Sequence, residues 1–584
     1  MNWEIIPIQK LARFDTLTYE APKNSKFCTG QLVYVPLKNI TIPGLIYKPT
    51  RGKVFYQLKE IIGLFDIKPI LSPTQIDFCQ WMASNYICSL SEVCYQLIPA
   101  KFRKVRKKDL ANSFLPNSNY QAPISKSQPL YKKMSIYFQG GMKSRFLEYK
   151  KIIQKTAGQT LIITPDINII PQSIIKLLPD IYIHNTNTPK VEFESWQTIY
   201  KNQPKAILGS HKSLLLPIKK MKNVILDQEN HPQIQYDQKP YYDLRIAIKD
   251  LAKQNNSNLY IGSNFPSLIT YQEIHLNKLQ LKNISPVKLA KIFIIPTDKQ
   301  TPVEKQNLSY QSEKIISQNL ICRTPIVLLI LKKGFAQALI CKSCMTVLNC
   351  IKCGKNLRLV ESQKLYCANC KQDTMIPSNC NICKSTNLEI IGLGQLGIEN
   401  YLKQTYPKAK ISTLENSKKF DIAVITPRNL AQVGKINDLI LVYPESMLSN
   451  PNYNIKEKLH QIIYSARMIC NNLYIQTQIP KNKFWQIIQD PRNFLESELS
   501  NRKKYGLPPA KKIIMVQGPS PEISKIQDKI QTKNTVLGPA PVLSNSKLYQ
   551  IIIKTNNDNF PEIAKILNKI KSVKIRYKID PIDL

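Results

Sequence analysis

Eight of the 14 cysteines form four Cys-x-x-Cys pairs between residues 341 and 383. The pairs are Cys341/Cys344, Cys350/Cys353, Cys367/Cys370 and Cys380/Cys383. Two thiolates separated by two residues can bind one tetrahedral Zn²⁺ through a tight turn, and two such pairs complete a four-cysteine site. The segment contains no histidine and leaves no ligand over, so neither metal keeps an open position for water. The spacing therefore predicts two structural zinc sites.

Disulfides and iron–sulfur ligation are competing interpretations of the same thiols. Disulfides are disfavoured in a reducing compartment, and the start MNWEIIPIQKLARFD lacks the apolar region of a secretory signal. Gly354 follows Cys353, as expected where the chain turns past a metal ligand. The remaining cysteines occur in apolar contexts and are expected in the core. They are Cys28, Cys79, Cys88, Cys94, Cys322 and Cys470.

The charge balance points to a polyanionic partner. Lys and Arg number 82 against 40 Asp and Glu, which gives a formal net charge of +42. Such a surplus costs self-repulsion unless it is neutralised, and nucleic acid is the obvious partner. A general drift of composition towards Lys, Asn and Ile is the alternative. No run of about 18 uncharged apolar residues is present, so we expect a cytoplasmic chain without a membrane partner.

The elements that must position these groups fall into several domains, because 584 residues exceed a single core. Residues 1–105 alternate short apolar runs with turn residues and predict a β-rich domain, in which Ser72-Pro73 opens a helix bearing Phe78, Trp81, Met82 and Tyr86 on one face. That stripe is more typical of core than of a ligand site. Residues 106–130 are basic and then rich in Ser, Asn and Pro, which indicates a linker.

The rest of the chain alternates strand-like and helical runs. In 131–290 the strands MSIYF, QTLIITP, KAILGS, KNVILD and NLYIGS predict a parallel α/β sheet. A second α/β lobe, with PIVLLIL, EIIGLG, FDIAVITP and DLILVYP, covers 291–340 and 391–482. The cysteine module, 341–390, interrupts it, and 483–584 is expected to be an α+β domain. The predicted fold class is therefore α/β, with the module inserted in the second lobe.

Particular segments carry a family resemblance. LKKGFAQALICKSC precedes the cysteines and LEIIGLGQLGIENYLKQTYPKAKI follows them, while FDTLTYEAP, GQLVYVPL, TLIITPDINIIPQ, GSHKSLLLP, RKKYGLPP and VLGPAP lie elsewhere. Together with the order of the cysteine pairs, these resemble the primosomal replication-restart helicases, the primosomal protein N-prime family, over nearly the whole chain. The linker 106–130 leaves little room for the winged-helix domain that the resemblance implies there.

The resemblance implies two RecA-like lobes of a superfamily-2 helicase and an amino-terminal domain that captures the 3′ end of a nascent strand. The implied partners are forked, 3′-ended and single-stranded DNA, primosome and helicase-loading proteins, and single-stranded DNA-binding protein. It also implies how two Zn²⁺ ions are shared. The outer site is Cys341, Cys344, Cys380 and Cys383, and the inner site is Cys350, Cys353, Cys367 and Cys370.

The nucleotide motifs depart from the family. A Walker A loop needs G-x-x-x-x-G-K-[ST], whose glycines let backbone N–H groups approach phosphates. The matching text is YFQGGMKSRF, which keeps Lys143 and Ser144 but has Tyr137 and Met142 at the glycine positions. The DEEH-type segment has become DQEN, so that Asp227 and Glu229 are the groups that could still serve Mg²⁺.

Lobe two departs in the same way. Where the family has Q-x-x-GRAGR, the chain reads LHQIIYSARMIC, in which only Gln461 and Arg467 remain. Without a placed arginine the γ-phosphate lacks its usual clamp in the transition state. We therefore predict no catalytic residues, and ATP with Mg²⁺ is a doubtful ligand of the relic site Lys143, Ser144, Asp227 and Glu229.

Three functions are compatible with the sequence. The first is a replication-restart primosomal protein that binds branched or stalled-fork DNA and reloads the replication machinery without helicase activity. The second is an active, divergent ATP-dependent 3′→5′ DNA helicase, and the third is a zinc-ribbon RNA-binding or assembly protein. Candidate phosphate contacts beside the cysteines are Lys332, Lys333, Lys342, Lys352 and Lys355.

Overall fold

The computed structural model describes the chain except for 10–14, 24, 51–56, 67, 106–109, 111–133, 286–287, 298–307, 332–335, 342, 345–347, 353–356, 362–363, 368–369, 414–418, 449–451, 531–534, 543–544, 571, 573 and 582–584. It divides into two compact units. Unit 1 comprises 1–286, 506–539 and 550–581. Unit 2 comprises 287–505, 540–549 and 582–584. Almost all of the expected linker, 106–130, lies outside the described residues.

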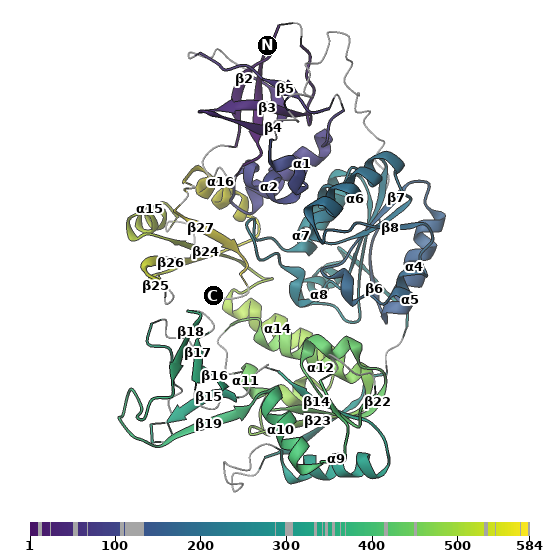
Figure 1. The fold of residues 1–584 in the computed structure, drawn as a ribbon, viewed down its shortest axis with the longest axis vertical. Coiled ribbons are helices and arrows are strands. Elements are labelled where there is room, and N and C mark those ends of the chain that lie inside the picture. Colours follow the sequence, from purple (N-terminus) through teal and green to yellow (C-terminus); the bar gives the residue numbers. More distant parts are fainter. Residues whose placement is uncertain are drawn as a thin grey trace. The chain divides into compact units, whose positions relative to one another are not determined.

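The amino-terminal part of unit 1 is a small β-domain. Its antiparallel sheet has the order β2-β1-β4-β3-β5, built from β1 (Asn2–Pro7), β2 (Leu17–Glu20), β3 (Leu32–Leu37), β4 (Ile40–Pro49) and β5 (Gly63–Leu64). Helices α1 (Pro73–Asn85) and α2 (Leu90–Leu97) and the 3-10 helix η1 (Ala100–Arg103) follow, with α1 and α2 beside the purple strands in Figure 1. Ser72 caps α1 in a capping box and Pro73 is its first residue, as predicted.

Lobe one, also in unit 1, is a seven-stranded parallel sheet of order β12-β6-β11-β10-β7-β9-β8. Its strands are β6 (Ser135–Gln139), β7 (Gln159–Ile163), β8 (Ile181–Ile183), β9 (Ala206–Gly209), β10 (Met221–Asp227), β11 (Asn258–Ser263) and β12 (Gln280–Asn283). Its helices are α4 (Met142–Lys155), α5 (Gln172–Ile175), α6 (Pro189–Asn202), α7 (Leu244–Gln254) and α8 (Leu268–His275), and its 3-10 turns are η2 (Ile167–Ile169), η3 (His211–Leu215) and η4 (Pro232–Ile234). The five strand motifs read from the sequence all lie in this sheet, which confirms the parallel α/β prediction.

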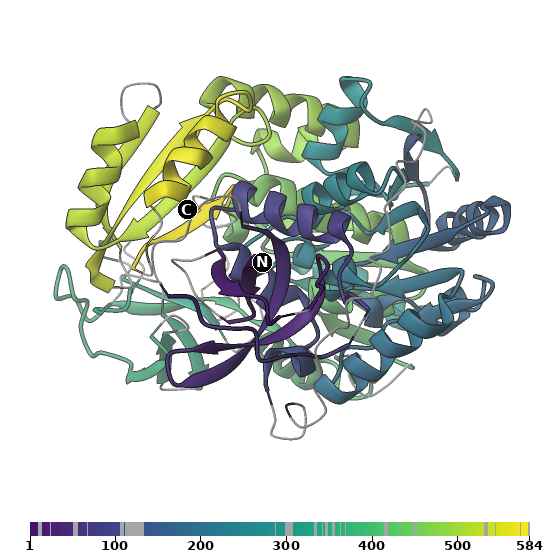
Figure 2. The same cartoon turned by 90° about the horizontal axis from the view of Figure 1, so that it is seen from above.

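The carboxyl-terminal sheet has the order β25-β26-β24-β27. Its strands are β24 (Lys512–Gly518), β25 (Thr535–Val542), β26 (Asn545–Thr555) and β27 (Arg576–Ile579). Helices α15 (Ser520–Ile530) and α16 (Phe560–Ile570) pack against each other, and Figure 2 shows yellow helices running along the yellow strands. The arrangement is the α+β fold expected for the end of the chain.

Lobe two, in unit 2, is a six-stranded parallel sheet of order β13-β23-β22-β14-β21-β20. Its strands are β13 (Lys291–Pro296), β14 (Ile326–Ile330), β20 (Ile411–Ser412), β21 (Ile422–Ile425), β22 (Ile436–Val442) and β23 (Cys470–Thr477). Its helices are α9 (Tyr310–Ile321), α10 (Gln395–Thr405), α11 (Glu445–Leu448), α12 (Ile455–Ile469), α13 (Lys483–Ile487) and α14 (Pro491–Tyr505), with the 3-10 turn η6 (Pro427–Gln432). Strand β14, in the apolar run after Cys322, is fully buried, as expected of a core strand.

The cysteine module has two small antiparallel sheets. Strand β15 (Ala336–Cys341) pairs with β19 (Leu388–Leu393), and β16 (Arg358–Glu361), β17 (Lys364–Cys367) and β18 (Gln372–Met375) form the other. The expectation that EIIGLG joins the lobe-two sheet is therefore wrong, because β19 pairs with the strand that enters the module. Among the described residues, no helix is both long and apolar enough to cross a bilayer.

Candidate functional site

The outer cysteine cluster has the geometry of a tetrahedral metal site. The Sγ atoms of Cys341, Cys344, Cys380 and Cys383 all lie within 4.8 Å of one another. Sγ of Cys341 is 3.4 Å from Sγ of Cys383, and Sγ of Cys344 is 3.7 Å from Sγ of Cys380. Tetrahedral Zn–S bonds of about 2.3 Å place their sulfurs about 3.8 Å apart. A disulfide needs an S–S distance of about 2.05 Å, so the pairing interpretation does not fit.

The inner cluster brings together Cys350, Cys367 and Cys370, also within 4.8 Å. Sγ of Cys350 lies 3.9 Å from Sγ of Cys370. The fourth expected ligand, Cys353, and the following Gly354 lie outside the described residues. Three thiols at these distances can hold a metal ion with one further ligand.

Two residues that directly follow cysteines of the clusters have a left-handed backbone conformation. Lys371 follows Cys370 with φ of 54°, and Lys384 follows Cys383 with φ of 61°. The backbone N–H of Cys370 donates to Sγ of Cys367 at 3.4 Å, and that of Ile382 donates to Sγ of Cys380 at 3.4 Å. One backbone N–H group is thus directed at a sulfur atom in each of the two clusters.

The buried apolar core of the cysteine module is small in the part that the structure describes. Its buried core is Leu339, Leu348, Leu357, Leu365 and Cys367. In a module with so small a core, metal binding by the cysteines supplies folding free energy directly, which is the role of a structural metal site. Of the candidate phosphate contacts, Lys352 is exposed and donates to Gln372 Oε1 at 2.6 Å. Lys332, Lys333, Lys342 and Lys355 lie outside the described residues.

The other cysteines are buried, as expected, with one exception. Cys28, Cys79, Cys88, Cys94 and Cys470 are buried, whereas Cys322 is exposed. Cys322 ends α9 and precedes β14. The apolar run that follows it starts only at Ile326, so proximity to that run misled the prediction.

The relic Walker segment does not form a phosphate loop. Strand β6 continues to Gln139 and α4 begins at Met142, so Gly140 and Gly141 alone connect them. Tyr137, at the first glycine position, is buried inside β6, and its hydroxyl lies 3.2 Å from Oγ of Ser263. A P-loop needs several residues whose N–H groups wrap around phosphate. Here strand residues occupy most of those positions.

The residues expected to meet ATP are placed accordingly. Lys143 is exposed and Ser144 is half-buried in the first turn of α4. Gly140 packs closely, because a Cβ there would lie 2.7 Å from Cγ1 of Ile284. The segment is thus tightened by packing and offers no cradle for a triphosphate.

Arg145, which the sequence analysis overlooked, fills the position where Mg²⁺ would be held. Its Nε and Nη2 atoms donate to the two carboxylate oxygens of Asp227 at 2.6 and 3.0 Å. The two side chains are 1% and 0% exposed. Tyr149 Oη donates to Oδ1 of the same carboxylate at 2.7 Å. The carboxylate expected to bind a metal is therefore satisfied by protein donors alone.

The rest of the guanidinium is also paired. Nη1 donates to the carbonyl of Gly140 at 2.6 Å and to Oδ1 of Asn264 at 2.7 Å. Burial by itself lowers the pKa of Arg145, but the adjacent Asp227 carboxylate outweighs it and raises that pKa. A permanent internal cation on Asp227 repels a divalent ion at the same place, so the residues do not fit a Mg²⁺–ATP complex.

Glu229 has a structural task. Its carboxylate accepts from the backbone N–H and the hydroxyl of Ser267, both at 2.7 Å, and lies 3.7 Å from Nη1 of Arg245. Ser267 is the N-cap of α8. Burial raises the pKa of Glu229, and the Arg245 charge offsets part of that rise. Glu229 therefore joins the end of β10 to the start of α8.

The lobe-two arginine is committed elsewhere. Arg467 is buried, and its guanidinium donates to the carbonyls of Ala290, Ile488 and Gln489 at 2.8, 3.2 and 3.0 Å. Gln461 is half-buried on α12, and its carbonyl accepts from Ser465. Arg467 is thus engaged by backbone carbonyls and is not placed to clamp a transferring phosphate.

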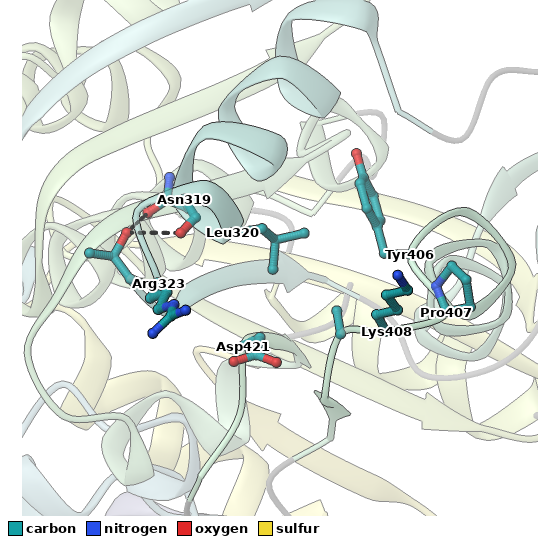
Figure 3. Close-up of a pocket in the computed structure, with 9 residues that line it drawn as sticks. Asn319, Leu320, Arg323, Tyr406, Pro407, Lys408 and Asp421 are labelled. Atoms are coloured by element: carbon teal, nitrogen blue, oxygen red, sulfur yellow. Dashed lines mark hydrogen bonds between the residues drawn. The ribbon is translucent and has the colours of Figure 1, made fainter.

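A cavity of about 650 Å³ lies at one edge of the lobe-two sheet (Figure 3). Leu320 and Arg323 line it from the end of α9, Lys408 from the loop before β20, and Asp421 from the start of β21. It is at the amino-terminal ends of β14 and β21, whereas ligands of parallel α/β sheets bind outside the carboxyl ends. The cavity is thus at the end of the sheet opposite to the one where nucleotides usually bind in this kind of fold.

A cavity of about 750 Å³ lies in unit 1, beside the amino-terminal β-domain. Glu4 and Asp15 supply carboxylates, Lys48 an ammonium group, and Tyr47 and Trp81 aromatic rings. Glu4 lies 3.8 Å from Nζ of Lys48, and Asp15 Oδ1 accepts from the backbone N–H of Leu90 at 2.8 Å. The mixture of carboxylate, ammonium and aromatic groups suits a nucleotide.

Trp81 differs in burial from the other residues of the helix face that was expected to lie in the core. Phe78, Met82 and Tyr86 are buried, whereas Trp81 is half-buried and lines the cavity. Periodicity places all four residues on one face of α1 but cannot tell which part of that face the neighbouring elements leave open. The FDTLTYEAP motif, which contains Asp15, was the available signal for this site.

Comparisons with known proteins find a family match for the amino-terminal domain and relatives along most of the chain. Residues 5–99 match the family described as "3'DNA-binding domain (3'BD)". Replication restart protein PriA of Rickettsia conorii is 23% identical over 94% of this chain and 94% of its own length, and that of Borreliella burgdorferi is 23% identical over 89% and 88%. That of Helicobacter pylori strain J99 is 22% identical over 95% and 96%.

Solved structures show a much weaker likeness. Helicase Lhr of Mycobacterium smegmatis covers 59% of this chain and 44% of its own, with 9% identity and a TM-score of 0.31. A DEAD box protein of Methanococcus jannaschii covers 64% and 86%, with 10% identity and a TM-score of 0.27. TM-scores this low carry no information about the fold beyond the strand orders given above.

A 3′ DNA-binding domain followed by two parallel α/β lobes and an inserted cysteine module defines a helicase-like DNA-binding protein of replication restart. Both lobes are parallel α/β sheets, and the nucleotide motifs of the chain are degenerate. Within that class, the chain is a divergent member of the replication restart protein PriA family.

Proposed function

We propose that this protein is a replication-restart factor that binds branched DNA at stalled forks and helps to reload the replication machinery without unwinding DNA by ATP hydrolysis. The observation that carries this proposal is the buried Arg145–Asp227 pair. It replaces Mg²⁺ with a side chain that cannot dissociate. The two-residue connection at Gly140 and Gly141 and the commitment of Arg467 to backbone carbonyls point the same way.

The cavity beside Trp81 is the proposed site for the 3′ end of a strand. The terminal deoxyribose of a DNA strand carries a 3′-hydroxyl that can donate to a carboxylate such as Asp15, whereas a 3′-phosphate would be repelled. Trp81 offers an aromatic face for a base, and such stacking is tolerant of sequence. This chemistry suits a protein that must recognise strand ends irrespective of sequence.

We further propose two structural Zn²⁺ ions per chain, with Cys353 as the fourth ligand of the inner site. Support comes from the Sγ spacing of the two clusters and from the N–H groups that point at Cys367 and Cys380. The module then acts as a rigid DNA or protein contact. Primosome, helicase-loading and single-stranded DNA-binding proteins remain the proposed protein partners, and the cytoplasm the proposed compartment.

The test is steady-state ATP hydrolysis by the purified full-length protein, with and without forked DNA, beside Lys143→Ala. Fork binding with no turnover above the Lys143→Ala background is the expected result. DNA-stimulated hydrolysis that Lys143→Ala abolishes would establish the alternative, an active 3′→5′ helicase. Equal affinity for forks, plain duplex and RNA at matched salt would instead favour the RNA-binding or assembly alternative.

A further inference from the structure

The cavity beside Trp81 has a second wall that does not belong to the 3′ DNA-binding domain. Helix α16, from the carboxyl-terminal sheet, contributes Lys565, Asn568 and Lys569 to its lining. All of these residues belong to unit 1. The site therefore combines residues that are nearly 500 positions apart in the sequence, as the hydrogen bond from Asn568 to Ser84 illustrates.

Helix α16 is held firmly in this position. Asn568 Nδ2 donates to the carbonyl of Ser84, in α1, at 3.1 Å. Four residues of α16 are buried, namely Phe560, Ile563, Ala564 and Leu567, and two of them, Phe560 and Ala564, also line the cavity. The helix is thus anchored by buried apolar residues and by Asn568, beside the exposed Lys565 and Lys569 that also line the cavity.

The charges on the two walls differ. The wall from the 3′ DNA-binding domain presents the carboxylates of Glu4 and Asp15, and Lys48 lies 3.8 Å from Glu4. The α16 wall presents Lys565 and Lys569, both exposed and four residues apart on the same helical face. Four residues correspond to a rise of about 6 Å along the helix. Two ammonium groups so placed can contact successive phosphates of one strand.

We propose that α16 of the carboxyl-terminal domain holds the sugar–phosphate backbone of the strand whose 3′ end lies in the cavity, through Lys565 and Lys569. The terminal sugar faces the carboxylates, the last base lies against Trp81, and the preceding phosphates face α16. This inference rests on the proposed function, since it assumes that the cavity receives a 3′ end. It makes the end-binding site a joint product of two domains.

The experiment measures equilibrium binding of the full chain to a labelled fork with a 3′-hydroxyl strand end at the branch, over a range of salt concentrations. A second fork is identical but ends in a 3′-phosphate. Three proteins are compared: wild type, Lys565→Ala/Lys569→Ala, and Lys525→Ala/Lys529→Ala. The last pair is a matched control, because Lys525 and Lys529 are exposed, four residues apart on α15 of the same domain, and do not line the cavity.

Removing two phosphate contacts should lower the slope of log K against log salt by about 1.4 and weaken binding about tenfold at physiological salt. The preference for 3′-hydroxyl over 3′-phosphate should survive in Lys565→Ala/Lys569→Ala, because Glu4 and Asp15 are intact. The Lys525→Ala/Lys529→Ala variant should retain the wild-type slope. Thermal unfolding checks that both variants fold.

Two failures are distinguishable. If wild type binds the hydroxyl and phosphate forks equally, the cavity does not receive a 3′ end and the proposed function loses its end-recognition step. If wild type prefers the hydroxyl fork but the α16 variant keeps its slope and affinity, the role of α16 is refuted alone. An equal loss in both double variants would also refute it, because only total charge would then matter.

Discussion

Replacing Arg145 by methionine tests whether the relic nucleotide site is now a structural ion pair. The substitution leaves the Asp227 carboxylate, which is 0% exposed, without its cationic partner. The Gly140 carbonyl and the Asn264 amide oxygen lose a donor at the same time. Removing one member of a buried pair costs about 3–5 kcal/mol, so Arg145→Met should destabilise lobe one by that amount.

The double variant Arg145→Met/Asp227→Leu should recover most of the loss, because apolar residues of similar size can replace a buried pair at little cost. A residual loss of about 1–3 kcal/mol is expected, since the Tyr149 hydroxyl is then left unpaired. The control is Lys143→Met, two residues earlier on α4 and exposed, which should change stability by less than about 0.5 kcal/mol. In a functional P-loop, by contrast, Lys143 would be the essential residue, and its substitution would impair function more than that of Arg145.

The chain has several cores, so its unfolding is not a two-state transition. Native-state hydrogen exchange of peptides from β6 and β10 reports the local opening free energy instead. The opening free energy of these strands in Arg145→Met is compared with that of the wild type. If the two values agree within about 0.5 kcal/mol, the ion pair does not stabilise lobe one and the reasoning is wrong. Recovery in the double variant would show that the loss comes from the unpaired charge and not from lost side-chain volume.

The remaining predictions concern the metal, the core and pH. Cys353→Ser should release about one metal ion per chain in a metal-content assay, and release of none would refute the inner-site assignment. Gly262→Ala places a Cβ 2.0 Å from Tyr149 Oη and should destabilise lobe one by about 1–3 kcal/mol in the same exchange assay, so an unchanged exchange rate would contradict it. Burial lowers the pKa of His184 to about 4, so the folded protein holds this side chain neutral. The contribution of His184 to folding stability is complete above its ordinary pKa and is lost as the pH falls towards the lowered value. Between pH 7 and 5 that loss is on the order of 2 kcal/mol, and His184→Gln should abolish most of this pH dependence of the opening free energy measured by hydrogen exchange in lobe one.

Regular patterns were predictable because they depend on neighbours in the chain. The parallel strands of lobe one follow from buried apolar runs separated by helical stretches, and Ser72-Pro73 identifies the start of α1. The strand EIIGLG was assigned to the wrong sheet, because an apolar run reveals that it is a strand but not which partner it pairs with. β19 pairs with β15 because these strands lead into and out of the cysteine module.

The amino-acid sequence by itself determined the family, the four cysteine pairs and the loss of the nucleotide motifs, since each is a matter of residue type at fixed spacing. It did not reveal that Arg145 would form an ion pair with Asp227, or that α16 would complete the lining of the cavity beside Trp81. Those facts depend on contacts between residues that are 82 positions apart in the first case and far more in the second. Such contacts exist only after sheets and helices have packed, because burial decides which charges must find a partner and which remain free to bind a ligand.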